Sequence, residues 1–383
     1  MVSINQNMLK LKEGMLHKYL DLASNPNILS LSIGEPDFAT PYHIRQAAID
    51  AIEQGKTFYT PAKGLLGLCK EIANFFERKY TLSYDPATEI MTTVGASEAI
   101  EVAIRTLLNP GDEVILVTPA YLSYEPLILM AGGTVVTVDT YEKDGFKLTA
   151  EALQSKLTDK TRLIILNYPN NPTGAIMTHD DYLALAEVLK DKDIHIISDE
   201  IYSELNYTKK HASLAHIDMI KYKVIVLNGF SKTYSMTGWR LGYILASKEL
   251  IDLFVKYHQN AILCPPTISQ FAGLEALKNG DEEIEMMREE YDSRRRYALD
   301  KLNSMGLTCP NPQGAFYLFA NVKAKTGLNS TEFCDALLKE KSVAVIPGIA
   351  FGSSGNDYIR FSYCYSLEHI KEALERIEEF IKN

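Results

Sequence analysis

Three stretches in the middle of the chain decide how we expect it to fold. They read RLIILNYPNNPTG (162–174), IHIISDEIY (194–202) and KVIVLNGFSKTYSMTGWR (223–240). Each begins with a segment rich in Ile, Val and Leu rather than a strict alternation of apolar and polar residues, which is typical of strands covered on both faces in a mostly parallel sheet. Polar residues follow each run. Ligands of open α/β sheets bind beyond the carboxyl ends of the strands, so these polar residues are the first candidates for a functional site.

Apolar runs of the same kind lie on either side of this core. They are EIMTTV (89–94), EVILVTP (113–119), GTVVTVD (133–139) and LGYILAS (241–247). Helical patterns separate several of the runs, for example at 98–108 and 180–190. The alternation predicts an α/β fold whose large domain holds a mostly parallel seven-stranded sheet between helices.

The pattern changes after Pro266. A long helical stretch, interrupted at 279–280, reaches about residue 303, and shorter apolar runs and two more helical patterns follow it. Because 383 residues exceed what one hydrophobic core usually holds, we expect two domains. We place the large domain at 42–285 and a smaller α+β domain at 1–41 together with 286–383.

Composition and charge narrow the class of partner. The net charge is −10, with 46% hydrophobic and 23% charged residues, as in an ordinary soluble globular protein. The sequence shows no cluster of basic residues of the kind that binds nucleic acid. It also shows no apolar run typical of a signal peptide or long enough for a membrane span. The five cysteines stand far apart without metal-binding spacing. We therefore expect free thiols, no metal site, no nucleic-acid or membrane partner, and a cytoplasmic protein.

The segment Gly95-Ala96-Ser97 is a candidate anion site. It follows one apolar run and begins the helical pattern EAIEVAIRTLL. Small residues at a helix N-terminus leave backbone N–H groups free for a phosphate. Taken alone, a simple turn with Ser97 as the helix N-cap is the commoner interpretation.

Two polar segments after the central runs are candidates for contacts with a ring. The segment from Asn167 to Gly174, NYPNNPTG, predicts a rigid loop that can hold an amide side chain over a site. Asp199 ends the run IHIISD, where a buried carboxylate needs strong hydrogen bonds or a cationic partner. A protonated pyridine nitrogen is one such partner, although a loop aspartate is the commoner interpretation of Asp199 alone.

The last segment carries the candidate nucleophile. Lys232 lies between two buried runs, where desolvation can lower the pKa of an amine and allow it to attack a carbonyl group. Arg240, eight residues later, can bind a phosphate through two hydrogen bonds. These four segments, in this order and each after a predicted strand, make a specific combination.

With these motifs the chain resembles the fold-type I pyridoxal-phosphate-dependent aminotransferases of class I/II. The resemblance runs from IGEPDF (33–38) to Arg360, and SKTYSMTGWRLGY (231–243) is most similar to the bacterial aspartate and aromatic branch, including PatA-like enzymes acting on N-acetyl-diaminopimelate. It implies a Schiff base between the cofactor and Lys232, which also moves the substrate proton. Asp199 would keep the pyridine nitrogen protonated, while Asn171 and Tyr202 would bind the phenolic oxygen of the ring.

The resemblance also implies the rest of the site. Tyr121 would stack on the ring, and Gly34, Asn171 and Arg360 would bind the substrate, with Gly34 and Arg360 holding its α-carboxylate. Tyr59 would reach the phosphate in the neighbouring subunit, so a homodimer with shared active sites is expected. The residues implied for the phosphate site of the same subunit are Ala96, Ser97, Ser231 and Arg240.

At two positions the residue differs from the one found in some relatives of this family. Gly229 replaces a phosphate-binding serine of some relatives, and Ser97 replaces a lysine that binds the distal carboxylate in certain aspartate-specific ones. Other interpretations also exist for three of the implied residues. Tyr121 is one of 22 tyrosines, Gly34 can be a turn residue, and Arg360 can pair with an internal carboxylate.

We therefore predict a ping-pong aminotransferase that passes an amino group from an L-amino acid to a 2-oxo acid, with 2-oxoglutarate as the expected acceptor. The donor is aromatic, aspartate-like or N-acetyl-diaminopimelate, and its side chain would contact residues such as Ile33, Met8 and Leu16. A C–S β-lyase that uses the same cofactor is the alternative, and a non-catalytic regulatory protein is a more remote one.

Overall fold

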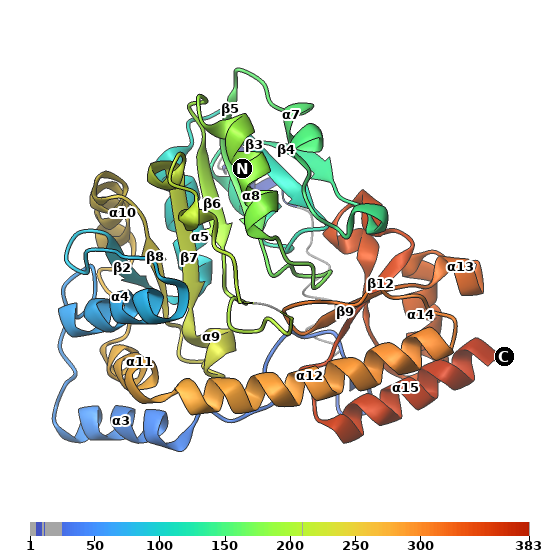
Figure 1. Cartoon of the computed structure of the whole chain (residues 1–383). Coiled ribbons are helices and arrows are strands. Elements are labelled where there is room, and N and C mark those ends of the chain that lie inside the picture. Colours follow the sequence, from blue (N-terminus) through green and yellow to red (C-terminus); the bar gives the residue numbers. More distant parts are fainter. Residues whose placement is uncertain (1–4, 10, 12–24, 209, 383) are drawn as a thin grey trace, which may run out of the picture.

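The central feature of the computed structural model is a seven-stranded sheet with the strand order β2-β8-β7-β6-β5-β3-β4 (Figure 1). The structure describes residues 5–9, 11, 25–208 and 210–382. All neighbouring strands are parallel except where β8 pairs with β7 and β2. The strands are β2 (Ile90–Thr93), β3 (Glu113–Thr118), β4 (Thr134–Asp139), β5 (Thr161–Asn167), β6 (His195–Asp199), β7 (Val224–Gly229) and β8 (Gly242–Leu245).

Each of these strands coincides with one of the seven predicted apolar runs, with β5 beginning one residue earlier at Thr161, so the α/β prediction with a mostly parallel seven-stranded sheet is confirmed. The continuous apolar runs are explained by burial of both faces of the sheet. In β6, Ile196 and Ile197 are both fully buried, although successive side chains of a strand point to opposite faces.

Helices cover both faces of the sheet. On one face, α5 and α10 pack with Ile197 and Leu227 in a single hydrophobic cluster. On the other face, α4, α8 and α11 pack with Ile196 and Val226. The helices around the sheet are α3 (Tyr42–Glu53), α4 (Leu66–Tyr80), α5 (Gly95–Leu107), α6 (Tyr124–Met130), α7 (Ala150–Gln154), α8 (His179–Leu189), α10 (Lys248–Ala261) and α11 (Thr267–Asn279).

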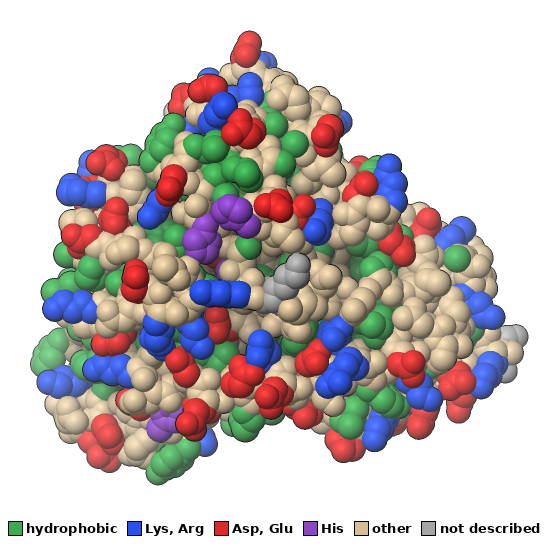
Figure 2. Space-filling model, in the orientation of Figure 1, with side chains coloured by type: hydrophobic (Ala, Val, Ile, Leu, Met, Phe, Trp, Pro, Cys, Tyr) green, Lys and Arg blue, Asp and Glu red, His purple; other side chains and the backbone are tan. Residues whose placement is uncertain are grey.

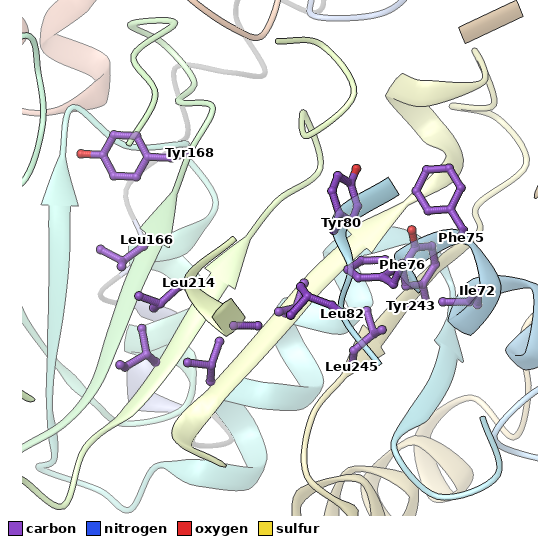
Figure 3. Close-up of a cluster of buried hydrophobic side chains, with 14 of the residues drawn as sticks. Ile72, Phe75, Phe76, Tyr80, Leu82, Leu166, Tyr168, Leu214, Tyr243 and Leu245 are labelled. Atoms are coloured by element: carbon purple, nitrogen blue, oxygen red, sulfur yellow. The ribbon is translucent and has the colours of Figure 1, made fainter. Parts of the chain in front are cut away.

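Figure 3 shows part of the hydrophobic cluster that includes α4, α8 and α11, in which aromatic side chains form the contact between helix and sheet. Phe76 of α4 makes an edge contact with Tyr243 of β8, with ring centroids 6.1 Å apart. Phe75 and Tyr80 pack beside it. Such aromatic contacts bury large apolar areas and fix α4 against the edge of the sheet.

The C-terminal part has a core of its own. Its three-stranded antiparallel sheet has the order β11-β12-β9, and a short strand near the N-terminus, β1, pairs in parallel with β10. Helix α12 runs beneath both parts of the molecule and lies beside α15 (Figure 1). The elements are β1 (Leu29–Ser30), α12 (Asp281–Ser304), β9 (Tyr317–Asn321), α13 (Lys323–Thr326), α14 (Ser330–Lys341), β10 (Val343–Ala344), β11 (Ile346–Pro347), β12 (Tyr358–Ser362) and α15 (Leu367–Lys382).

The division into domains at 42–285 and at 1–41 with 286–383 stays a prediction. The seven-stranded sheet lies within the first range and the three-stranded sheet within the last. The predicted boundary at 285 falls inside α12, which begins at Asp281 after a break at Gly280. A boundary inside a helix means that α12 would link the two domains rigidly.

The distribution of charged side chains on the surface agrees with the mixture of acidic and basic residues in the sequence. Acidic and basic side chains are interspersed on the face shown in Figure 2, without a large area of one sign. Within the residues that the structure describes, no helix is both long and apolar enough to cross a membrane.

Candidate active site

A cavity of about 280 Å³ lies where β5, β6 and β7 end. Every residue predicted to act in catalysis or to bind the cofactor or the substrate carboxylate lines this cavity except Tyr59. Those that line it are Gly34, Ala96, Ser97, Tyr121, Asn171, Asp199, Tyr202, Ser231, Lys232, Arg240 and Arg360. They come from segments more than 300 residues apart along the chain, and the two sheets bring them to one place.

Asp199 lies at the end of β6 and is almost completely buried. The Tyr124 hydroxyl donates a hydrogen bond to its Oδ2 over 2.6 Å, and the backbone N–H of Ile201 donates to Oδ1 over 3.1 Å. Burial raises the pKa of Asp199 to about 6, although these two hydrogen bonds act in the opposite direction. No cationic side chain among the described residues pairs with the carboxylate, so a positively charged group in the cavity would stabilise it.

Lys232 belongs to the short helix α9 (Phe230–Thr233), which follows β7 directly. Its Nζ donates a hydrogen bond to the carbonyl oxygen of Gly34 over 2.5 Å. The pKa of Lys232 is lowered to about 8, mainly by burial; Cys364 and Glu35 act to raise it, and the charges of Arg360 and Arg240 act to lower it. A large fraction of this amine is therefore neutral near pH 8, which a lysine nucleophile requires.

The predicted phosphate site forms at the first turn of α5. The helix begins at Gly95, with Val94 as its N-cap, so the alternative in which Ser97 caps the helix is wrong. The guanidinium group of Arg240 lies against Gly95, where an added Cβ would come within 2.5 Å of Nη2. The same arginine donates to the Thr237 carbonyl over 2.9 Å. The helix N-terminus and the guanidinium group together form a cradle suited to a phosphate.

At Gly229, the position of a serine in some relatives, a side chain would be tightly packed and its neighbours would have to shift by a few tenths of an ångström. A Cβ at this position would lie 3.1 Å from both the Cα of Gly242 and the carbonyl oxygen of Leu241. The pairing of β7 with β8 brings these backbones together, because Gly229 and Gly242 lie opposite each other. Ser231, which lines the cavity, is therefore the hydroxyl group available from this segment.

Arg360 lies in the middle of β12 and is almost completely buried. Its Nη1 donates to Oδ1 of Asn171 over 2.9 Å, and its Nη2 donates to the carbonyl oxygen of Ser32. Its Nε is buried without a hydrogen-bond partner among the described residues. The internal carboxylate considered as an alternative partner is absent from the described part of the chain, and an anionic ligand would satisfy the unpaired donor.

Tyr59 lies elsewhere and is 83% exposed. It lines a separate hollow with Phe58 and Ile262, so it does not contact the cavity of its own subunit. Of the residues expected to contact the donor side chain, Ile33 lines the cavity, whereas Met8 is half exposed and does not line it. Leu16 lies outside the described residues.

Three side chains that form hydrogen bonds with predicted site residues were not themselves predicted. Tyr124 binds Asp199, and Tyr317 lies in the cavity with its hydroxyl 2.9 Å from that of Tyr202. Asn167, the first residue of the predicted loop, joins that loop to β6: its Nδ2 donates to the backbone oxygen of Asp199, and its Oδ1 accepts from the backbone N–H of Asn171. The position of Tyr124, three residues after Tyr121 where a helix begins, was the available signal for one of them.

These features fit pyridoxal phosphate. The buried carboxylate of Asp199 suits a protonated pyridine nitrogen, and the cradle around Gly95 and Arg240 suits the phosphate. Lys232 supplies an amine of lowered pKa for the aldehyde carbon. The unpaired Nε of Arg360 remains for a carboxylate of a substrate.

The chain is similar to known proteins over almost its whole length. Residues 26–377 match the family described as "Aminotransferase class I and II". The chain is 42% identical to a Bacillus subtilis protein named "Probable N-acetyl-LL-diaminopimelate aminotransferase", with 96% of this chain and 92% of that protein covered. It is 41% identical to "Aromatic-amino-acid aminotransferase 2" of Thermococcus litoralis, with coverage of 96% and 95%. The crystal structure of an aromatic aminotransferase from Pyrococcus horikoshii OT3 superimposes with a TM-score of 0.90 at 43% identity, covering 96% of this chain and 98% of that one.

The pKa of Lys232 can be measured by its reaction with a small acylating reagent. In protein freed of cofactor, the rate of modification of Lys232 should rise with pH and level off above a midpoint near 8, because only the neutral amine reacts. Lys190 is the matched control, since Glu187 raises the pKa of this exposed lysine above its usual value. Peptide mass spectrometry between pH 6 and 10 follows both residues, and identical profiles would contradict the lowered pKa.

Proposed function

Because the chain belongs to the class I and II aminotransferases, which use pyridoxal phosphate to move an amino group from an amino acid to a 2-oxo acid, we propose that Lys232 holds the cofactor and moves the proton during transfer. The lowered pKa of Lys232 in the cavity is the observation that carries this proposal. When bound, the cofactor supplies an electron-accepting ring that stabilises negative charge at the substrate Cα.

Each side chain at the cavity has a part in the proposal. Lys232 Nζ lies in the cavity, where it would remove the proton from the substrate Cα and carry it to the cofactor. Asp199 keeps a proton on the pyridine nitrogen, because a buried carboxylate favours a neighbouring positive charge. Arg360 binds the α-carboxylate, which places the Cα–H bond near Lys232.

The phosphate and the ring are held by the remaining residues. Backbone N–H groups at Ala96 and Ser97, the hydroxyl of Ser231 and the guanidinium group of Arg240 would bind the phosphate. Tyr121 would stack on the ring. Asn171 and Tyr202 would donate hydrogen bonds to its phenolic oxygen, and both side chains are buried at the cavity wall, which supports this assignment.

Replacement of Lys232 or Asp199 tests the proposal. Lys232→Ala should reduce turnover by at least about a thousandfold, because the proton loses its carrier, while the phosphate cradle still binds cofactor. Asp199→Asn should reduce turnover by at least about a hundredfold with the fold intact, because a neutral amide cannot hold the ring proton. The control is Lys190→Ala at an exposed lysine, which should stay within about twofold of the parent in steady-state assays. Substantial turnover by Lys232→Ala would disprove the role of Lys232.

The lining of the cavity favours a donor with an uncharged side chain. The cationic side chains among its described residues are Lys232, Arg240 and Arg360, and each has a role in the proposal. Ser97 stands where certain aspartate-specific relatives have a lysine, and Ile33 and Ile100 add apolar surface. Among the described residues of one chain, a second carboxylate would find only neutral donors such as the Ser97 hydroxyl, which bind anions more weakly than a cation does.

A donor panel tests this preference without any 2-oxo acid. Conversion of the yellow absorbance band of the bound cofactor should be about 10 to 100 times faster with phenylalanine or tyrosine than with aspartate at equal subsaturating concentrations. Added 2-oxoglutarate, the expected acceptor, should restore the yellow band. Faster conversion by aspartate, or conversion by N-acetyl-diaminopimelate alone, would overturn the preference. Release of pyruvate and ammonia from a cysteine conjugate without any 2-oxo acid would instead indicate the C–S lyase alternative.

We also propose that two copies of the chain form a dimer with shared active sites. Phe58 is 81% exposed and Tyr59 83% exposed, which is unusual for neighbouring aromatic residues on a protein surface. They line a hollow of about 540 Å³ that also includes Val94. Because Val94 precedes the phosphate cradle at Gly95, a partner seated in this hollow would lie next to the active site, and the Tyr59 hydroxyl could reach the phosphate of the partner subunit.

Sedimentation velocity tests the dimer. Phe58→Asp should shift the protein towards the monomer, because a charge placed in an apolar interface loses its hydration without a partner. Tyr222→Asp, at a tyrosine that is 60% exposed, is the control and should leave the mass unchanged. Tyr59→Phe should remain dimeric but bind the cofactor about tenfold more weakly, since it loses a hydrogen bond to a charged phosphate. A fully dimeric Phe58→Asp variant would place the interface elsewhere.

The cytoplasmic location likewise remains a proposal. It is supported by the five cysteines, all of which are free thiols in the structure. Free thiols are typical of a reducing compartment.

A further inference from the structure

Tyr317 is a buried tyrosine of the cavity wall to which the proposed function gives no role. It is the first residue of β9, and only 1% of its surface is exposed. Three groups of the proposed site surround it: the hydroxyl of Tyr202, the guanidinium group of Arg360 and the backbone of Gly34. Its side chain therefore contacts both the group proposed to bind the ring and the group proposed to bind the substrate.

The hydroxyl of Tyr317 lies 2.9 Å from the hydroxyl of Tyr202. Among the described residues, neither hydroxyl has another hydrogen-bond partner. A phenol has a single hydrogen to donate and lone pairs with which to accept. If Tyr202 gives its hydrogen to the phenolic oxygen of the cofactor, then Tyr317 has to be the donor in the pair. In the isolated chain either hydroxyl could be the donor, but the proposed function requires that Tyr317 donates and Tyr202 accepts.

The ring of Tyr317 supports Arg360. The Cζ atom of Arg360 lies 4.5 Å from the ring centroid, on the face of the tyrosine. This contact, together with the hydrogen bonds to Asn171 and Ser32, fixes the plane of the guanidinium group. The ring and the hydroxyl of Tyr317 therefore contact different partners, and a phenylalanine can separate their effects.

The close approach of Gly34 shows that the pocket is built around the hydroxyl. A Cβ atom at residue 34 would lie 1.8 Å from the Tyr317 hydroxyl oxygen, so any other residue at position 34 would displace the tyrosine. The carbonyl oxygen of Gly34 also accepts the hydrogen bond from Lys232. The glycine thus keeps both Lys232 and Tyr317 in position.

We propose that Tyr317 is a positioning residue whose hydroxyl donates to Tyr202 and strengthens the hydrogen bond from Tyr202 to the phenolic oxygen of the cofactor, while its ring holds Arg360 for the substrate carboxylate. The inference rests on the proposed function. Hydrogen bonds in a chain polarise one another, so a phenol that accepts a hydrogen bond becomes a better donor. A better donor stabilises the negative charge on the phenolic oxygen. This stabilisation lowers the pKa of the bound cofactor, which therefore loses its proton at a lower pH.

The experiment is a pH titration of the absorbance of the bound cofactor in the holoenzyme without substrate. Tyr317→Phe should raise the midpoint by about 0.5 pH unit, because the hydrogen bond from Tyr202 weakens. The affinity of Tyr317→Phe for a 2-methyl amino acid, which cannot lose a Cα proton, should stay within about twofold of that of the parent protein, because phenylalanine keeps the ring against Arg360. Tyr317→Leu should raise the midpoint and also weaken this binding about tenfold.

The matched control is Tyr291→Phe. Tyr291 is a buried tyrosine that packs on Phe316, next to Tyr317 in the chain, and its hydroxyl has no hydrogen-bond partner among the described residues. This variant should titrate and bind the analogue as the parent does. A Tyr317→Phe variant with an unchanged midpoint would overturn the inference, whether or not Tyr317→Leu folds. If the parent protein shows no yellow band with added pyridoxal phosphate, the proposed function fails instead, so the two failures are distinguishable.

Discussion

The burial of one carboxylate, that of Asp199, constrains the rest of the site. A charged group at the end of a central strand loses its hydration, and the Tyr124 hydroxyl and one backbone N–H compensate for only part of that loss. The pKa of Asp199, raised to about 6, results from this uncompensated loss of hydration. A protonated ring nitrogen would compensate for it, so under the proposed function the protein would bind the cofactor most tightly in the form in which the ring accepts electrons. Binding energy and catalytic chemistry thus depend on the same contact.

The topology of the sheet places the other groups around this carboxylate. Asn167, Asp199 and Gly229 end three adjacent parallel strands, so the residues that follow them meet at one edge. The strand β8 runs in the opposite direction, and for this reason Arg240, which precedes it, lies at the same edge as Lys232, which follows β7. A single antiparallel strand therefore brings the amine of Lys232 and the guanidinium group of Arg240 to the same edge of the sheet.

Much of this arrangement could be predicted from the sequence because it depends on local patterns. The continuous apolar runs predicted all seven strands of the large sheet, and the polar residues after them predicted Asn171, Asp199 and Lys232 as cavity residues. The reversed direction of β8 could not be predicted in this way, because an apolar run has the same composition in either direction. Arg360 and Gly34 were identified by resemblance alone, since the packing of the C-terminal sheet against the large one sets their positions.

The unpredicted tyrosines show where such patterns stop being informative. Tyr124 and Tyr317 are two of 22 tyrosines, and many of the others fill the core. Whether a buried phenol fills space or positions a reacting group depends on what lies within hydrogen-bond distance of its oxygen. That neighbour is Asp199 for Tyr124 and Tyr202 for Tyr317, each distant in the sequence. Tertiary packing decides these roles.

The most direct test of the central claim is to locate the covalently bound cofactor. Treatment of the purified yellow protein with borohydride would fix the cofactor to the amine that holds it, and tryptic peptides would then be analysed by mass spectrometry. We expect the phosphopyridoxyl group on Lys232 alone, in a peptide that covers residues 224–240, because trypsin does not cleave after a modified lysine. Attachment to another lysine, or a yellow protein with no modified Lys232 after reduction, would contradict the account of the site.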